Sequence, residues 1–378
     1  MIRARGGRQG ARGGMGRGPF GLSRGMGGMR GSLEPVAGTS GSSIPVDSLT
    51  VPQAVVRRHE MLLPTSLEHT ALDFMVATVK TVVDAIVADR DEYEDFPLDE
   101  VHLVGSFKKG TIISGQNVAD MVVVMHILPT KDSVDKLCNK VWSDTNGLLC
   151  SENLPVIRMR HERGFTLLNL GGIRDLTLGV CVLVTTHYEN LPGLVAGVHV
   201  DPRLAWINRT AVRHAQWFGE HCNSVSIKML VRLLRDICSR HAGLHAVNPW
   251  MIDLLGHYCI IHSLGQRQVI EPALRRALSL LASGIFEPKC AIIEDPCEVP
   301  ANRTHFSIDR ASQDLIAATA TAVLNFLTGG GHLVVLGLSV RRSNVFELPD
   351  DTDPEARAHA TDSTSSDDDS SDAAESSD

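Results

Sequence analysis

The chain has 378 residues, of which 43% are hydrophobic and only 4% aromatic, so a large and mainly aliphatic core is expected. Its formal net charge is −8. No run of about 18 uninterrupted apolar residues occurs, which argues against a membrane span. The eight cysteines form no Cys-x-x-Cys pair and the chain does not open on an apolar leader, so we expect reduced thiols in a cytosolic or nuclear protein.

The two ends of the chain have opposite charge. Residues 1–31 contain seven arginines spaced by glycines and no acid, whereas residues 347–378 contain twelve acids and one arginine. Neither end has enough apolar surface to offset the entropy lost on folding. We therefore predict a disordered Arg/Gly-rich tail over 1–45 and a disordered acidic Ser/Asp tail over 347–378.

Both tails contain candidate functional residues. In the first tail, charge and arginine stacking favour RNA contact, with a merely solubilising or methylated tail as the alternative. The nucleic-acid contact candidates are Arg3, Arg5, Arg8, Arg12 and Arg17. In the second tail, three hydroxyl residues each have an aspartate three positions later, which suits an acid-directed kinase. These phosphorylation candidates are Thr364, Ser365 and Ser366.

Residues 50–200 mix helix and strand patterns. Thr65 and Glu68 have the spacing of a capping box, which predicts the start of a helix whose apolar face extends to Ile86. Apolar runs between turn residues predict strands over 101–104, 118–128, 154–160, 165–170 and 176–186, with a helix over 131–147. A polar, glycine-rich turn is expected after the first strand. This part is predicted to be a mixed α/β region.

Residues 201–346 show almost only helical patterns. The predicted helices cover 202–219, 224–241, 249–264, 271–285 and 310–328. The last helix is apolar on nearly every side, which favours a dimer interface, with burial in its own monomer as the alternative. The interface candidates are Ile316, Ala320, Val323, Leu324 and Leu327. Together the two parts predict an α+β protein.

Two basic or histidine-rich patterns receive ordinary explanations. Lys228, Arg232 and Arg235 lie along one side of helix 224–241, where a solvated basic face is commoner than phosphate contact. His241 and His245 have His-x₃-His spacing, but Gly243 and the expected helix end spoil a shared face. We therefore expect no metal site there.

The segment from residue 104 to residue 128 contains the pattern with the clearest chemistry. A strand ends at Gly105-Ser106, a polar turn with Lys108 follows, and Asp120 comes early on the next strand. Template-free nucleotidyltransferases use this arrangement. Their Gly-Ser turn contacts the triphosphate, the next strand supplies Asp-x-Asp for two Mg²⁺ ions, and a later strand adds a third carboxylate. Residues two apart on a strand face the same side, so both aspartates reach one phosphate.

Two of the three carboxylates are missing here. Asp120 matches the first, but Val122 occupies the second position, and strand 176–186 has no acid inside it, with only Asp175 at its start. One carboxylate is too little charge for two Mg²⁺ ions. We therefore predict that catalysis is absent and expect no cofactor, with weak nucleotide or Mg²⁺ binding through Gly105, Ser106, Lys108 and Asp120 left open. The alternative is an ordinary strand-to-turn junction beside a solvated aspartate.

Four separated motifs make the chain similar to a known family. They are residues 105–111 with 115–120, residues 213–218, residues 249–258 and residues 295–298, with the sequences GSFKKGT and GQNVAD, RHAQWF, PWMIDLLGHY, and DPCE. In this order they resemble the DZF domain (domain associated with zinc fingers) over roughly residues 60–340. The resemblance implies a degenerate template-free nucleotidyltransferase fold without catalysis.

The resemblance also implies partners and a setting. The helical part would form a heterodimer with a DZF protein that has double-stranded-RNA-binding domains. Such a complex acts in transcription regulation and RNA metabolism, on RNA and DNA, mainly in the nucleus with a cytoplasmic fraction. Two alternatives stay open: an active nucleotidyltransferase, and a direct RNA binder acting through the Arg/Gly tail.

Overall fold

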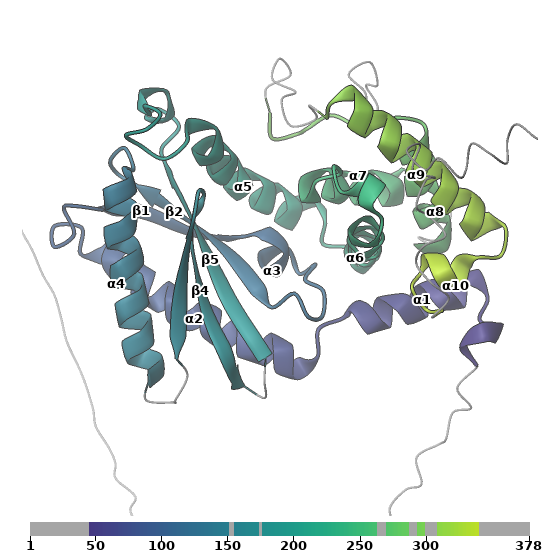
Figure 1. Cartoon of the computed structure of the whole chain (residues 1–378), viewed down its shortest axis with the longest axis horizontal. Helices are drawn as coiled ribbons and strands as arrows, with labels where there is room; N and C mark the ends of the chain where they lie inside the picture. The colour runs from purple at the N-terminus through teal and green to yellow at the C-terminus, as the bar shows by residue number, and fades with distance from the viewer. Residues whose placement is uncertain are drawn as a thin grey trace, which may run out of the picture. The chain divides into compact units, whose positions relative to one another are not determined.

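The computed structural model describes residues 45–150, 155–173, 176–262, 270–286, 293–298 and 308–339 (Figure 1). The predicted tails, with their arginine and phosphorylation candidates, lie outside these residues apart from position 45, and so does Asp175. Within them, no helix combines the length and the apolar character that crossing a membrane requires.

A five-stranded mixed sheet forms the first part of the structure. Its order is β1-β2-β5-β4-β3, with β2 and β5 parallel and every other pair antiparallel. The bounds are Leu98–Val104 for β1, Val118–Met125 for β2, Val156–His161 for β3, Gly164–Ile173 for β4 and Leu176–Thr186 for β5. The fifth strand has the predicted bounds, and β2 ends three residues earlier than predicted.

Helices cover both faces of the sheet. Side chains alternate along a strand, so Met121 and Val123 of β2 pack with α2 (Ser66–Ala88) and α4 (Lys131–Cys150). Val122 and Val124 point the other way, toward α5 (Pro202–His221). Figure 1 shows α5 and α4 on different sides of the strands. The helix α5, which was expected to belong to the helical part, therefore packs on the sheet.

The predicted capping box at the start of α2 is confirmed. Thr65 accepts a hydrogen bond from the backbone N–H of Glu68, and the Glu68 carboxylate accepts one from the backbone N–H of Thr65. The same carboxylate also accepts from Ser114 and from the backbone of Gly115. These bonds lower the pKa of Glu68 although burial opposes them. The cap therefore also fixes the loop that leads into β2.

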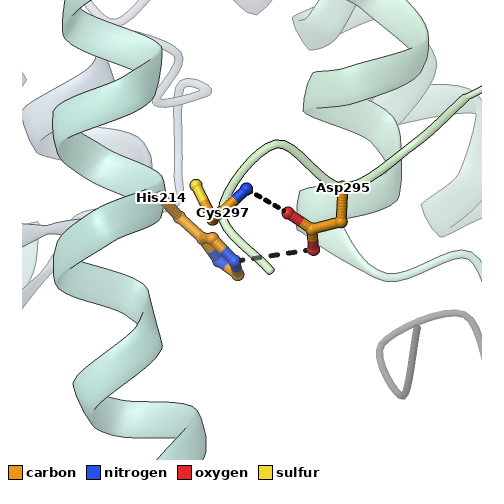
Figure 2. Close-up of side chains that lie close together, drawn as sticks. All are labelled: His214, Asp295 and Cys297. Carbon is orange, nitrogen blue, oxygen red and sulfur yellow. Dashed lines mark hydrogen bonds and ion pairs between the residues drawn. The ribbon is translucent and has the colours of Figure 1, made fainter. Parts of the chain in front are cut away.

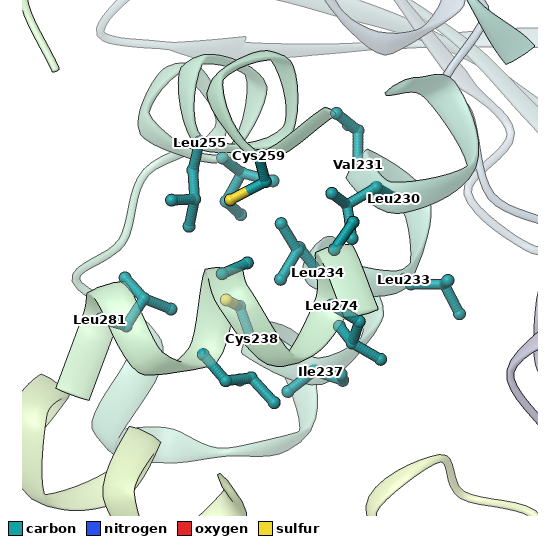
Figure 3. Packing of buried hydrophobic residues seen from close by; sticks show 14 of the residues in the cluster. Leu230, Val231, Leu233, Leu234, Ile237, Cys238, Leu255, Cys259, Leu274 and Leu281 are labelled. Atoms are coloured by element: carbon teal, nitrogen blue, oxygen red, sulfur yellow. The ribbon is translucent and has the colours of Figure 1, made fainter. Parts of the chain in front are cut away.

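The second part of the structure is helical. Its larger helices are α6 (Val225–Arg240), α7 (Pro249–Ile261), α8 (Ile270–Ala282) and α9 (Arg310–Thr328), followed by the short α10 (His332–Val335). Their shared core is aliphatic, and Figure 3 shows leucines and cysteines of α6, α7 and α8 meeting in it. Asn248 caps α7 through the backbone N–H of Met251, as the Asn-Pro pair predicts.

The first helix of the chain packs far from its neighbours in sequence. Helix α1 (Val51–Leu62) contacts α6, α8 and α10, and its Ala54 and Val55 are buried in the helical core. Single 3₁₀ turns complete the described elements at Val46–Ser48, Leu191–Gly193 and Ala242–Leu244. This helix was not predicted from the sequence, and through it the helical part includes a segment that precedes the sheet in the chain.

The structure corrects the dimer-interface candidates on α9. Ile316, Ala320, Val323 and Leu327 are at most 4% exposed and belong to the helical core of this same chain, and Leu324 packs partly buried against it. The helix has the predicted bounds, but its apolar stripe faces α8 and the turn before α7. Because a buried side chain cannot contact a partner without unfolding, the monomer explanation holds for the four buried residues, whereas the partly buried Leu324 stays an interface prediction.

The buried His241 makes stability depend on pH. It follows α6, and burial, together with the Arg240 guanidinium, lowers its pKa from 6.5 to about 4. As pH falls from about 6.5 toward 4, His241 becomes protonated in the unfolded chain but stays neutral in the folded chain. The free energy of unfolding therefore decreases across this pH window. We expect wild type to lose about 1–2 kcal/mol more than His241→Asn between pH 7 and pH 5, allowing for solvent screening. Urea unfolding of both proteins at the two pH values measures this, and parallel pH profiles would contradict it.

Candidate functional site

The predicted strand-to-turn junction is a strand-to-helix junction in the structure. Directly after β1, residues Gly105–Lys109 form the short helix α3. Gly105 has a φ of 66°, and a Cβ there would lie 2.1 Å from Asp120 Oδ2. Only glycine therefore allows the helix to start this close to the carboxylate. The structure brings Gly105 and Asp120 together, as the sequence predicted.

The Asp120 side chain is partly buried and is surrounded by cationic side chains. Burial raises the pKa of its carboxyl, while the charges of Arg163, Arg235 and Lys109 act in the opposite direction.

Among the described residues, the neighbouring positions on β2 and β5 do not carry a second carboxylate beside Asp120. Val122, two residues along the same face, is fully buried in an apolar cluster with Val104, Leu183 and Ala215 of α5. The residue of β5 that pairs with Asp120 is Cys181. Burial raises the pKa of its thiol first, and the Asp120 charge raises it further. One carboxylate, one protonated thiol and one valine do not fit a pair of Mg²⁺ ions, which prefer oxygen ligands.

The other two predicted nucleotide-binding residues, Ser106 and Lys108, do not line the cavity beside Asp120. Lys108 is exposed. Lys109 points inward instead, and its Nζ lies 2.6 Å from Asp253 Oδ2 of α7, with side chains 9% and 4% exposed. The adjacent lysine is therefore the inward one, because a five-residue helix turns consecutive side chains about 100° apart.

Basic residues of α6 bind protein carbonyls. Arg232 donates to the backbone oxygens of Ile112 and Gly110, at 3.1 and 2.6 Å. Arg235 donates to the backbone oxygen of Thr111 at 3.0 Å and to the side chain of Gln116. Neither the phosphate role nor the solvated face considered from the sequence applies to these two arginines. They fasten the loop between α3 and β2 to the helical part.

A cavity of about 840 Å³ opens between the sheet and the helical part. Asp120, Gly105 and Lys109 lie on one side of it, and residues of α5 and of the start of α7 lie on the other. Its charged lining residues include Arg163 and Arg203 besides Lys109. A space of this size is typical of small-molecule pockets, and its charged lining residues are mainly cationic.

One wall of the cavity contains a polar cluster that was not predicted from the sequence. His214 of α5 stacks on Trp250 of α7, with ring centroids 3.9 Å apart and an interplanar angle of 8°. The Trp250 Nε1–H donates to Asp295 Oδ2 at 2.8 Å, and the backbone N–H of Cys297 donates to Asp295 Oδ1 at 2.8 Å. Figure 2 shows His214, Asp295 and Cys297 converging. Three of the four motifs noted in the sequence meet here, although nothing in their spacing predicts it.

Solved structures with similar folds belong to nucleotidyltransferases. E. coli MS115-1 CdnC in complex with HORMA-deltaN matches with a TM-score of 0.52 and 13% identity, covering 75% of this chain and 94% of that one. CdnC with ATP matches with a TM-score of 0.51 and 11% identity, covering 75% and 95%. Cid1, whose structure was solved to explain its RNA terminal uridylyl transferase activity, matches with a TM-score of 0.48 and 11% identity. The match covers 73% of this chain and 93% of that one. At these identities the likeness concerns the fold alone, an α+β nucleotidyltransferase-like fold with a helical second part.

Family models cover both parts of the chain. The DZF N-terminal domain matches residues 37–223 and the DZF C-terminal domain matches residues 226–354. The boundary between the two falls between α5 and α6, which is where the helices stop covering the sheet. With most of its length matched in the expected order, and with the fold described above, the chain belongs to the DZF family.

Proposed function

We propose that this chain is a non-catalytic DZF subunit that forms a heterodimer with a double-stranded-RNA-binding DZF protein. The observation that supports the loss of catalysis is the set of side chains around Asp120. The second ligand position, Val122, is buried in an apolar cluster, and Cys181 occupies the neighbouring strand. Two-metal phosphoryl transfer needs several anionic oxygens at such a site. The described residues at these positions provide one carboxylate, that of Asp120.

The proposed role of the complex is in transcription regulation and RNA metabolism in the nucleus, with a cytoplasmic fraction. Support comes from family membership and from the charged ends of the sequence, an arginine-rich segment over 1–31 and an acidic one over 347–378. The RNA-binding domains of the partner would supply most of the nucleic-acid affinity. Arg3, Arg5, Arg8, Arg12 and Arg17 would add nonspecific phosphate contacts.

The full-length chain, mixed with a DZF protein that has double-stranded-RNA-binding domains, is expected to form a stable 1:1 complex. Size-exclusion chromatography with light scattering measures the mass of the mixture and of each protein alone. The matched control is a double-stranded-RNA-binding protein without a DZF domain, which should leave the elution of this chain unchanged. A chain that elutes as a monomer in both mixtures would remove the heterodimer from the proposal.

A residual nucleotidyltransferase is the second candidate, because the cavity contains Lys109, Arg163 and Arg203 beside Asp120. The proposal predicts no incorporation of nucleotides into an RNA end when the purified complex is given nucleoside triphosphates and Mg²⁺. Incorporation that is lost in Asp120→Asn would favour this candidate. A direct RNA binder is the third, and it predicts that removing residues 1–31 abolishes RNA retention by the chain without its partner.

A further inference from the structure

Three side chains of different chemistry meet beside the cavity. His214 comes from α5, while Asp295 and Cys297 come from the segment 293–298 that precedes α9 in the chain (Figure 2). One ligand atom of each lies within 4.8 Å of the others, and among the described residues this is the one such group of three. Imidazole nitrogen, carboxylate oxygen and thiolate sulfur are the donors that zinc accepts in proteins.

The site buries negative charge, and the described residues place no Lys or Arg in an ion pair with it. The Asp295 side chain is 1% exposed. Among the described residues, the group that forms an ion pair with it is His214, whose Nε2 lies 4.0 Å from Asp295 Oδ2. That distance exceeds a hydrogen bond. A buried carboxylate is stable only when it is paired, hydrogen-bonded or bound to a metal. Two N–H donors satisfy part of this demand, and a divalent cation would satisfy the rest.

Neighbouring groups already orient two of the three ligands. Trp250 stacks flat on the His214 ring and donates its indole N–H to Asp295, so one residue positions both. The backbone N–H of Cys297 fixes the other carboxylate oxygen, 2.8 Å away. Each carboxylate oxygen has a second lone pair free for a metal. Outer hydrogen bonds that orient the ligands are typical of metal sites.

We propose that His214, Asp295 and Cys297 form a zinc site, with a water molecule from the cavity as the fourth ligand. Zinc bonds of about 2.0–2.3 Å set tetrahedral ligand atoms roughly 3.3–3.8 Å apart. The three donor atoms, which lie within 4.8 Å of one another, therefore need to close by at most about 1.5 Å. His214 lines the cavity, which gives solvent access to the open position.

Binding would release one proton from the cysteine. Burial raises the pKa of the Cys297 thiol to about 12, and the Asp295 charge adds to this effect. The metal-free thiol is therefore protonated at neutral pH, and a zinc ion replaces its S–H bond with a Zn–S bond while the proton leaves to solvent. The apparent affinity should rise with pH. The bound ion would tie the segment 293–298 to α5.

Cobalt(II) is a suitable probe, because it binds to zinc sites and a cobalt–thiolate bond gives a charge-transfer absorption band. The full-length chain, reduced and treated with a chelator, is expected to bind one cobalt ion per chain. The thiolate-to-cobalt absorption should appear on titration and disappear when one equivalent of zinc is added. In Cys297→Ser the absorption should be lost, and His214→Phe, which keeps a ring to stack on Trp250, should weaken binding at least tenfold.

Cys181→Ser is the matched control, since Cys181 lies 3.6 Å from His161 but has no third ligand in the described residues. This variant should keep the full absorption. Circular dichroism of the metal-free variants checks that each is folded, and Asp295→Asn, which keeps a hydrogen-bond acceptor for Trp250, provides a second loss-of-ligand variant. No cobalt absorption in wild type, or equal absorption in Cys297→Ser, would overturn the proposal.

Discussion

Replacing Val122 with aspartate is expected to lower the free energy of unfolding by about 3–5 kcal/mol and to create no nucleotide transfer. The substitution restores the Asp-x-Asp pattern of active nucleotidyltransferases. However, Val122 is fully buried among Val104, Val124, Leu183 and Ala215, with α5 packed over it. A carboxylate there loses its hydration and finds no cation, so the structure either excludes the charge or loosens α5 from the sheet.

Val118→Asp is the matched control for this substitution. Val118 lies on the same face of β2, but it is 40% exposed at the start of the strand. The same change of side chain there should cost less than about 1 kcal/mol. Urea unfolding of wild type and both variants compares the costs, and an assay with Mg²⁺, nucleoside triphosphates and RNA measures transfer. Nucleotide transfer by Val122→Asp would contradict this expectation.

Much of the fold could be predicted from local sequence signals. The Thr65 capping box, the strand Leu176–Thr186 and the helix Arg310–Thr328 all have the predicted starts, because caps and apolar periodicity are local properties. The match to the DZF family confirms the resemblance that the motifs indicated. Elements whose position depends on distant contacts were harder, and the helix Val51–Leu62, which packs on α6 and α8, was not predicted.

The candidate site was predictable only in part for the same reason. Gly105 ends one predicted strand and Asp120 lies early on the next, so their contact could be predicted from the strand pattern. The choice between Lys108 and Lys109 depends on α3 being a helix, and a turn was expected there. His214 and Asp295 lie 81 positions apart in the sequence and meet through Trp250, which no local pattern encodes.

The α9 stripe shows a limit of periodicity as evidence for an interface. A helix that is apolar on most sides needs cover, but the pattern is the same whether the cover is a partner or the same chain. Here α8 and the turn Ala242–Leu244 provide it, and a Cβ on Gly243 would lie 2.0 Å from Thr319 Oγ1. Close approach of this kind is a property of the folded monomer, so the burial of the stripe needs no second chain.

Replacing Lys109 with methionine is expected to destabilise the chain by about 3–5 kcal/mol. The Lys109 ammonium and the Asp253 carboxylate form a buried pair 2.6 Å apart that joins α3 to α7. Burial raises the pKa of Asp253, and Lys109 is the main group that opposes this shift. Without Lys109 the buried carboxylate must take up a proton or draw in water, and either change costs stability. Thermal or urea unfolding measures the loss.

Two further variants separate the pair from the loss of packing. Lys108→Met changes the exposed neighbour and should alter stability by less than about 0.5 kcal/mol. Lys109→Met combined with Asp253→Leu should recover most of the stability lost in Lys109→Met, because replacing both ions with apolar groups removes the unpaired charge. If the double variant is no more stable than Lys109→Met, the approach of the Lys109 ammonium to the Phe218 and Trp250 rings, and not its ion pair with Asp253, holds α3 against α7.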